Sequence, residues 1–321
     1  ESKIEIDDLK NNKIIYTTPE FLIKQIHIIE GLKENIGLFA IDEAHCISQW
    51  SHDFRTSYLK LSIIKERFSN IPLLTVTATA TPRVIEEIYE LLDITEVNEY
   101  LIGTRRTNLF INIYSKNDFD ECKFDEPTII YVQTRKVCEQ IYEAFNERGI
   151  LCGYYHGGMG VEHKRRTHQQ FMNEEILVII ATISFGMGID KSNIRHVINY
   201  GVPTDIETYY QEIGRAGRDG KPANTLLIYG LDDLVIRRKM VEESSADNEH
   251  KLRENKRLDY LLSYAETPEC RRKVLLTYFD DFSKSCNNCD NCLNPPKLID
   301  GTVLAQKLLS TIYKTGQYFG Q

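Results

Sequence analysis

Short apolar segments alternate with amphipathic segments along the first half of the chain. Runs typical of buried strands occur in three places, at residues 13–18, 37–41 and 72–77. Residues 20–29 have the spacing of an amphipathic helix behind Pro19, and Thr81 followed by Pro82 is typical of a helix start. This alternation of strands and helices predicts a parallel sheet flanked by helices.

The same pattern restarts after the polar stretch at residues 103–108. Thr134 is placed to cap a helix that stops at Gly149. Strands are predicted on both sides of that helix, at residues 128–133, 151–156, 176–182, 194–200 and 225–230. From residue 232 the chain reads as mostly helical. The fold class is therefore α/β, with two tandem parallel-sheet domains followed by a helical module, and ligands often bind between two such domains.

Composition is that of an ordinary globular protein. The 321 residues are 42% hydrophobic and 27% charged, and no apolar run approaches the roughly 18 residues of a membrane helix. The N-terminus lacks the basic start and apolar stretch of a secretory signal. These features predict an intracellular protein that does not bind membranes.

The net charge of −8 argues against a protein that coats nucleic acid by overall charge. Contact with DNA must then come from local basic clusters. Three such clusters occur, at residues 164–166, 237–239 and 271–273. Each is equally compatible with a solvated helix face.

Two acidic residues directly follow the apolar segment at residues 38–41. Ligands of α/β sheets bind at the carboxyl ends of strands. Nucleotide hydrolysis needs a carboxylate to hold Mg²⁺ and a second group to orient the attacking water. Asp42 and Glu43 suit these roles. The alternative is an ordinary acidic turn.

Eight cysteines are distributed unevenly. Four are scattered in apolar surroundings and are predicted to be small core residues: Cys46, Cys122, Cys138 and Cys152. The other four crowd one region at ligand spacing: Cys270, Cys286, Cys289 and Cys292. Such spacing lets four thiolates bind one tetrahedral ion, which predicts structural Zn²⁺, with free thiols or disulfides as the alternative. Thr267 and Pro268 are expected to open a helix with Cys270 in its first turn.

The acidic pair belongs to a longer recognisable motif. Residues 42–45 (DEAH) resemble the DEAH box of superfamily 2 helicases and thereby add His45 to the site, while residues 46–55 resemble the aromatic-rich loop of the RecQ family of DNA helicases. In that family the loop senses single-stranded DNA. Trp50 and Phe54 can stack on bases and Arg55 can meet phosphate; the less favoured alternative for Trp50 is simple core packing. Ser51 stands where the family usually has Gly.

Two segments of the second domain also resemble RecQ motor motifs, residues 181–190 (ATISFGMGID) and 211–220 (QEIGRAGRDG). The resemblance implies that Arg218 is an arginine finger acting on the transferred phosphoryl group. Arg215 and Gln211 support it, and Gly188 and Asp190 contact the nucleotide. The alternative is that these are ordinary surface arginines. It explains either motif alone, but it does not easily explain both in this order.

Further segments extend the resemblance. Residues 18–20 resemble a DNA-backbone contact of the first motor domain, which implies a DNA contact at Thr18, and residues 77–81 resemble the motif that couples hydrolysis to DNA movement. His156 and Thr182 are implied to meet DNA or shape its track. Residues 106–109 resemble the connection between the motor domains, although Thr107 replaces the usual Pro.

The resemblance implies four regions along the chain. Residues 1–108 form the later part of a first RecA-like domain, 109–231 a second RecA-like domain, 232–296 a helical zinc-binding subdomain, and 297–321 the start of a winged-helix domain. No G-x-x-x-x-G-K-[ST] motif, the phosphate-binding P-loop, is present. The expectation is therefore a chain truncated at both ends, which binds ATP poorly by itself.

The implied function is ATP-dependent 3′ to 5′ unwinding of duplex DNA from single-stranded DNA, in repair, recombination or replication. The implied cofactors are ATP, Mg²⁺ and Zn²⁺, and the partners are single-stranded and partly duplex DNA. The protein is expected in the nucleus of a eukaryote or the nucleoid of a bacterium. The alternatives are a zinc-stabilised DNA-binding or strand-annealing protein with a dead ATPase, and an RNA helicase.

Overall fold

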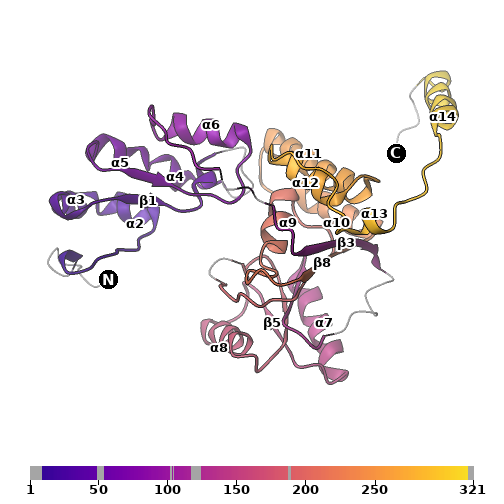
Figure 1. The fold of residues 1–321 in the computed structure, drawn as a ribbon, viewed down its shortest axis with the longest axis horizontal. Coiled ribbons are helices and arrows are strands. Elements are labelled where there is room, and N and C mark those ends of the chain that lie inside the picture. The colour runs from indigo at the N-terminus through magenta and orange to yellow at the C-terminus, as the bar shows by residue number, and fades with distance from the viewer. Residues whose placement is uncertain are drawn as a thin grey trace.

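The computed structural model describes residues 9–48, 54–101, 103, 105–116, 124–186 and 189–316 (Figure 1). In the first unit, β1 (Phe39–Ile41) and β2 (Leu73–Thr75) pair in parallel. Among the described residues, the helical segments that accompany them include α2 (Pro19–Lys24), α3 (Ile26–Glu30), η1 (Lys33–Asn35), η2 (Ala44–Ile47), α4 (Thr56–Leu59), α5 (Ser62–Arg67) and α6 (Pro82–Leu91). A buried cluster that includes Leu22, Ile41 and Ile88 joins them.

The second unit is built on a six-stranded parallel sheet in the order β3-β8-β7-β4-β6-β5. Its strands are β3 (Leu109–Ser115), β4 (Thr128–Val132), β5 (Cys152–Tyr155), β6 (Val178–Ala181), β7 (His196–Tyr200) and β8 (Ala223–Tyr229). Its helices are α7 (Arg135–Glu147), α8 (Val161–Met172) and α9 (Ile206–Ile213). Every residue of β4 and β6 is buried, as expected for central strands covered on both faces.

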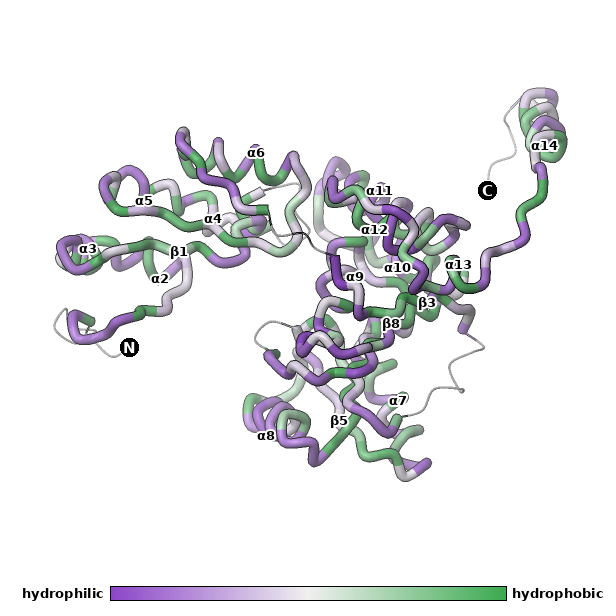
Figure 2. The backbone as a smooth tube through the Cα atoms, in the orientation of Figure 1, coloured by the Kyte–Doolittle hydropathy of each residue, from purple (hydrophilic) through white to green (hydrophobic). Residues whose placement is uncertain are grey.

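Helices make up most of the remaining chain: α10 (Leu231–Glu242), α11 (Asn248–Glu266), α12 (Arg271–Tyr278), α13 (Asp290–Leu293) and α14 (Thr302–Lys314). Figure 1 shows α10 to α13 beside β3 and β8, and α14 apart from them at the end of an extended segment. Figure 2 shows both hydrophobic and hydrophilic residues on α14, and its Leu304 and Leu308 are exposed. In the part of the chain that the structure describes, no helix is long and apolar enough to span a bilayer.

The cysteine-rich segment docks on strand β3, which is an edge strand of the sheet. Cys289 forms a parallel bridge with Ile111, and the amide of Ile113 donates to Asp290 Oδ2 over 3.1 Å. Arg271 Nε lies 3.0 Å from Asp290 Oδ1, and Arg272 donates to the carbonyl of Leu109. Both arginines are buried, so this basic cluster is not a solvated helix face. Its contacts join the cysteine-rich segment to strand β3.

Four local predictions were wrong. Residues 13–18 form no strand, and Ile14 and Tyr16 are exposed because no strand lies beside them. The helix predicted at 20–29 is broken at Gln25 into α2 and α3. Strand β3 follows the polar linker directly and was not predicted. Helix α12 begins after Cys270, which is its N-cap, because α11 runs to Glu266. The fold class is confirmed.

Candidate active site

The two acidic residues occupy a strained turn after β1. Glu43 has φ 50° in the left-handed region and is the N-cap of η2, and its amide donates to Asp42 Oδ1 over 2.9 Å. A residue with a side chain in this conformation costs about 1–3 kcal/mol, a strain that is typical of functional sites. The Asp42 side chain is exposed at the sheet edge, where a ligand can reach it.

A buried histidine joins the acidic turn to the loop after β2. His45 is 1% exposed, and its Nδ1 lies 2.8 Å from Thr77 Oγ1 and 3.3 Å from Glu43 Oε2. The amide of Thr79 in turn approaches Thr77 Oγ1 at 3.4 Å. The 77–79 loop and the Glu43 carboxylate therefore contact the same imidazole ring.

One hydrogen bond connects this series of contacts to the second unit. Gln211 Nε2, on α9, donates to Thr79 Oγ1 over 3.0 Å. Thr79 is 3% exposed, so water competes little for the bond. The bond thus joins the Gln211 segment to the loop after β2, which His45 in turn connects to the acidic turn.

The two candidate arginines follow Gln211 on the same segment. Arg218 Nη1 donates to the carbonyl of Ile189 over 3.1 Å and lies 3.4 Å from Asp190 Oδ1. That ion pair is open to solvent, with side chains 38% and 91% exposed, so it is weak and easily exchanged for another anion. Arg215 packs against Gly186, where an added Cβ would lie 3.1 Å from its Nη2. Gly186 therefore leaves room for this guanidinium.

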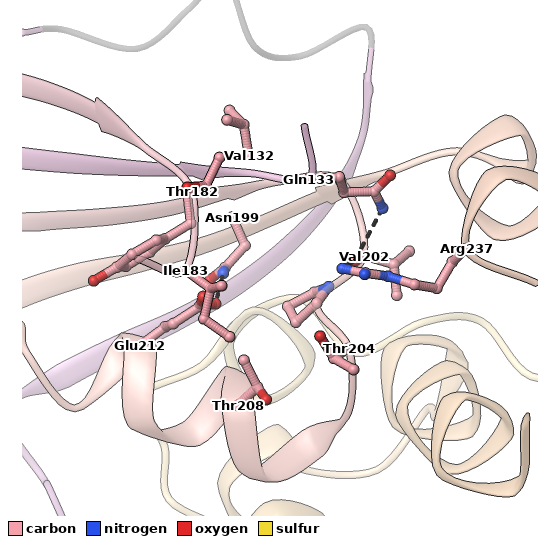
Figure 3. A pocket seen from close by; sticks show the side chains of 13 residues that line it. Val132, Gln133, Thr182, Ile183, Asn199, Val202, Thr204, Thr208, Glu212 and Arg237 are labelled. Carbon is pink, nitrogen blue, oxygen red and sulfur yellow. Dashed lines mark hydrogen bonds between the residues drawn. The ribbon is translucent and has the colours of Figure 1, made fainter. Parts of the chain in front are cut away.

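A small polar cavity lies at the carboxyl ends of β4, β6 and β7 (Figure 3). Its volume is about 80 Å³, and Gln133, Thr182 and Thr204 are among the residues that line it. Glu212 on α9 and Arg237 on α10 also line it, and Figure 3 shows them on opposite sides of the view. A cavity in this position, with several hydroxyl and amide groups, fits a polar segment of a ligand.

Glu212 is the buried acid of this cavity. Its carboxylate accepts from Asn199 Nδ2. Burial raises the pKa of Glu212 to about 8, although Asn199, Arg215 and Arg237 act in the opposite direction. The sequence patterns did not single out Glu212 and Asn199 as a site. The available signal was Asn199, an amide in the middle of an apolar strand.

The predicted DNA contacts differ in exposure. Thr182 lies on the cavity wall, and Thr18 caps α2 by accepting from the amide of Phe21. His156 is 5% exposed and lies 3.0 Å from Glu139 Oε1, while its Nδ1 accepts from the amide of Gly158. It therefore shapes its loop more than it presents a surface. Phe54 and Arg55 are half-buried, and Trp50 and Gly188 lie outside the described residues.

The cysteine cluster has the geometry of a tetrahedral metal site. The Sγ atoms of Cys270, Cys286, Cys289 and Cys292 all lie within 4.8 Å of one another. Sulfurs bound to one zinc ion at about 2.3 Å are roughly 3.8 Å apart, and Cys286 Sγ lies 3.9 Å from Cys292 Sγ. Four thiolates leave no position for substrate, so the donor set fits a structural Zn²⁺. Cys46 and Cys138 are buried in cores, as predicted.

Comparison with known proteins places this arrangement in a class. Models of the DEAD/DEAH box helicase domain and the helicase conserved C-terminal domain match residues 1–88 and 105–220. The solved structure of S. cerevisiae Dbp5 bound to RNA and ADP BeF3 is similar in fold, with a TM-score of 0.50 at 20% identity over 72% of this chain and 68% of that one. Models of both helicase domains thus match successive segments of this chain.

The remaining segment identifies the family. The RecQ zinc-binding model matches residues 231–293. The ATP-dependent DNA helicases RecQ of Haemophilus influenzae and Bacillus subtilis are each 38% identical to this chain over 96% of its length. The chain belongs to the RecQ helicase family. It spans about half the length of these relatives, 51% and 54% respectively.

Zinc content tests the cysteine site. The wild-type chain is expected to bind about one zinc ion, and Cys292→Ser to lose most of it and unfold at a lower temperature, because a structural ion contributes folding free energy. Cys152→Ser, in β5, is the matched control and should keep the ion. Metal analysis with thermal unfolding measures both. Full zinc content in Cys292→Ser would contradict the assignment.

The pH dependence of stability tests the burial of Glu212. Its folded pKa of about 8 exceeds the ordinary 4.5, so its stabilising contribution is complete below about pH 4.5 and is lost as the pH rises toward 8. The loss approaches about 1.4 kcal/mol per pH unit. Glu212→Gln should flatten the fall in unfolding free energy between pH 5 and 8. The control Glu147→Gln, on the exposed end of α7, should follow wild type. An unchanged slope in Glu212→Gln would refute the shifted pKa.

Proposed function

We propose that the full-length protein is an ATP-driven helicase that moves 3′ to 5′ on single-stranded DNA and unwinds duplexes during repair, recombination or replication. The observation that carries this proposal is the contact series from Glu43 through His45, Thr77 and Thr79 to Gln211. It gives the hydrolytic acid of one unit a physical connection to the arginine segment of the other. The names of the RecQ relatives support the same activity.

Each candidate residue has a role that its surroundings allow. The exposed carboxylate of Asp42 holds Mg²⁺ on the phosphates, and Glu43 orients the attacking water. His45 transmits the position of the 77–79 loop to Glu43. Arg218 exchanges Asp190 for the transferred phosphoryl group, with Arg215 and Gln211 in support. Gly188 and Asp190 contact the nucleotide.

DNA contacts are proposed along the edge where strands of both units end. Thr182 meets the strand at the cavity, and Thr18 and Arg55 contact it on the first unit, with Trp50 and Phe54 stacking on bases. His156 sets the shape of its loop. The partners are single-stranded and partly duplex DNA, so the protein acts in a nucleus or a nucleoid. Zn²⁺ stabilises the helical subdomain at residues 232–296.

ATP hydrolysis by the 321-residue chain alone is proposed to be slow. None of its residues forms the P-loop that cradles nucleotide phosphates. The region boundaries at residues 108, 231 and 296 are part of the same proposal. Tests of the motor therefore use the full-length protein.

Replacing the proposed general base tests the motor. Glu43→Gln in the full-length protein should still bind ATP and DNA, but its DNA-stimulated phosphate release should fall by about 100-fold or more, because the attacking water is no longer oriented. Glu34→Gln, an exposed site in η1 of the same unit, is the matched control and should retain activity.

Near-normal turnover in Glu43→Gln would discard the assigned base. Wild-type protein that anneals strands without any DNA-stimulated hydrolysis would favour the strand-annealing alternative. Stimulation by RNA far above that by DNA would favour an RNA helicase.

A further inference from the structure

The linker before β3 is tied to the loop that carries the two arginines. Arg106 Nη1 donates to the carbonyl of Gly214 over 3.1 Å, and its Nη2 donates to Ala216 at 2.7 Å and Gly217 at 2.8 Å. One planar guanidinium thus holds three backbone carbonyls on both sides of Arg215. Five donors in a fixed fork make arginine suited to this, whereas lysine offers a single point charge.

A second linker residue holds the other side of the same loop. Asn108 Nδ2 donates to the carbonyls of Gly217 over 2.9 Å and Lys221 over 2.8 Å. Gly217 has φ 55°, and a Cβ there would lie 2.5 Å from Asn108 Nδ2. The close approach therefore requires glycine. Arg218 is the next residue, so both contacts fix the backbone from which the proposed finger projects.

The linker is itself anchored from the zinc side. Asn288 lies between two zinc ligands, and its Nδ2 donates to the carbonyls of Thr107 over 3.0 Å and Leu109 over 3.1 Å. Arg272 also donates to the carbonyl of Leu109. The zinc subdomain therefore holds the backbone of residues 107–109. The side chains of Arg106 and Asn108 in turn hold the arginine loop.

We infer that Arg106 is a positioning residue for hydrolysis, which sets the place of Arg218 through the 214–217 backbone, and that the zinc subdomain holds Arg106 in register. Arg106 touches neither nucleotide nor acid turn in this role. The pKa of Arg106 is lowered, first by burial and also by the positive charge of Arg218, which agrees with the proximity of the two guanidinium groups. This inference rests on the proposed function.

The test compares two neighbouring arginines in the full-length protein. Arg106→Gln should lower the kcat of DNA-stimulated hydrolysis by at least about tenfold with little change in KM for ATP, because a misplaced finger loses contacts made in the transition state. Arg106→Lys should recover part of the loss. Arg105→Gln removes the same charge from an exposed position and should stay within about twofold of wild type.

A purely structural role is separated by three further measurements. Zinc content and DNA affinity of Arg106→Gln should match wild type. In an Arg218→Ala background, where no finger is left to position, Arg106→Gln should change kcat by less than about twofold. Should Arg106→Gln not fold, Asn108→Ala serves in the same comparison.

Different results would contradict the proposed helicase function and the positioning role of Arg106. A wild-type protein without DNA-stimulated hydrolysis overturns the proposed function. An active wild type in which Arg106→Gln keeps its kcat, or loses equally with and without Arg218, overturns the positioning role alone.

Discussion

A single hydrogen bond from Gln211 to Thr79 determines how the rest of the candidate site is interpreted. This bond joins Thr79, in the loop after β2, to helix α9 of the second unit. A series of polar contacts runs from Glu43 through His45 and Thr77 to Thr79, and of these side chains His45 and Thr79 are buried. Hydrogen bonds of such buried groups are directional and costly to leave unmade.

Helix α9 is the element on which these contacts converge. Gln211 donates to the first unit, and Glu212 lines the cavity together with Arg237. The loop after α9 contains Arg215 and Arg218. The loop is held by linker side chains, and the linker by the zinc subdomain. The zinc subdomain is thus connected through the linker to the loop that carries the proposed arginine finger.

Sequence patterns predicted what depends on local spacing. Four cysteines at ligand spacing, the acid pair after an apolar strand, and Thr134 as a helix cap were each visible in consecutive residues, and the structure bears them out. Features that depend on distant neighbours were missed. Residues 13–18 have a strand-like pattern but no strand beside them. Arg272 is buried where it donates to the carbonyl of Leu109 on β3, 163 residues earlier in the chain.

The most direct test is a double-mutant cycle across the two units, with Thr79→Val and Gln211→Leu made singly and together in the full-length protein. DNA-stimulated ATPase rates measure the coupling. A shared hydrogen bond predicts that the double variant loses clearly less than the product of the single losses, by a coupling of about 0.5–3 kcal/mol. Losses that simply multiply would show that the two units act on hydrolysis independently, and would contradict the account.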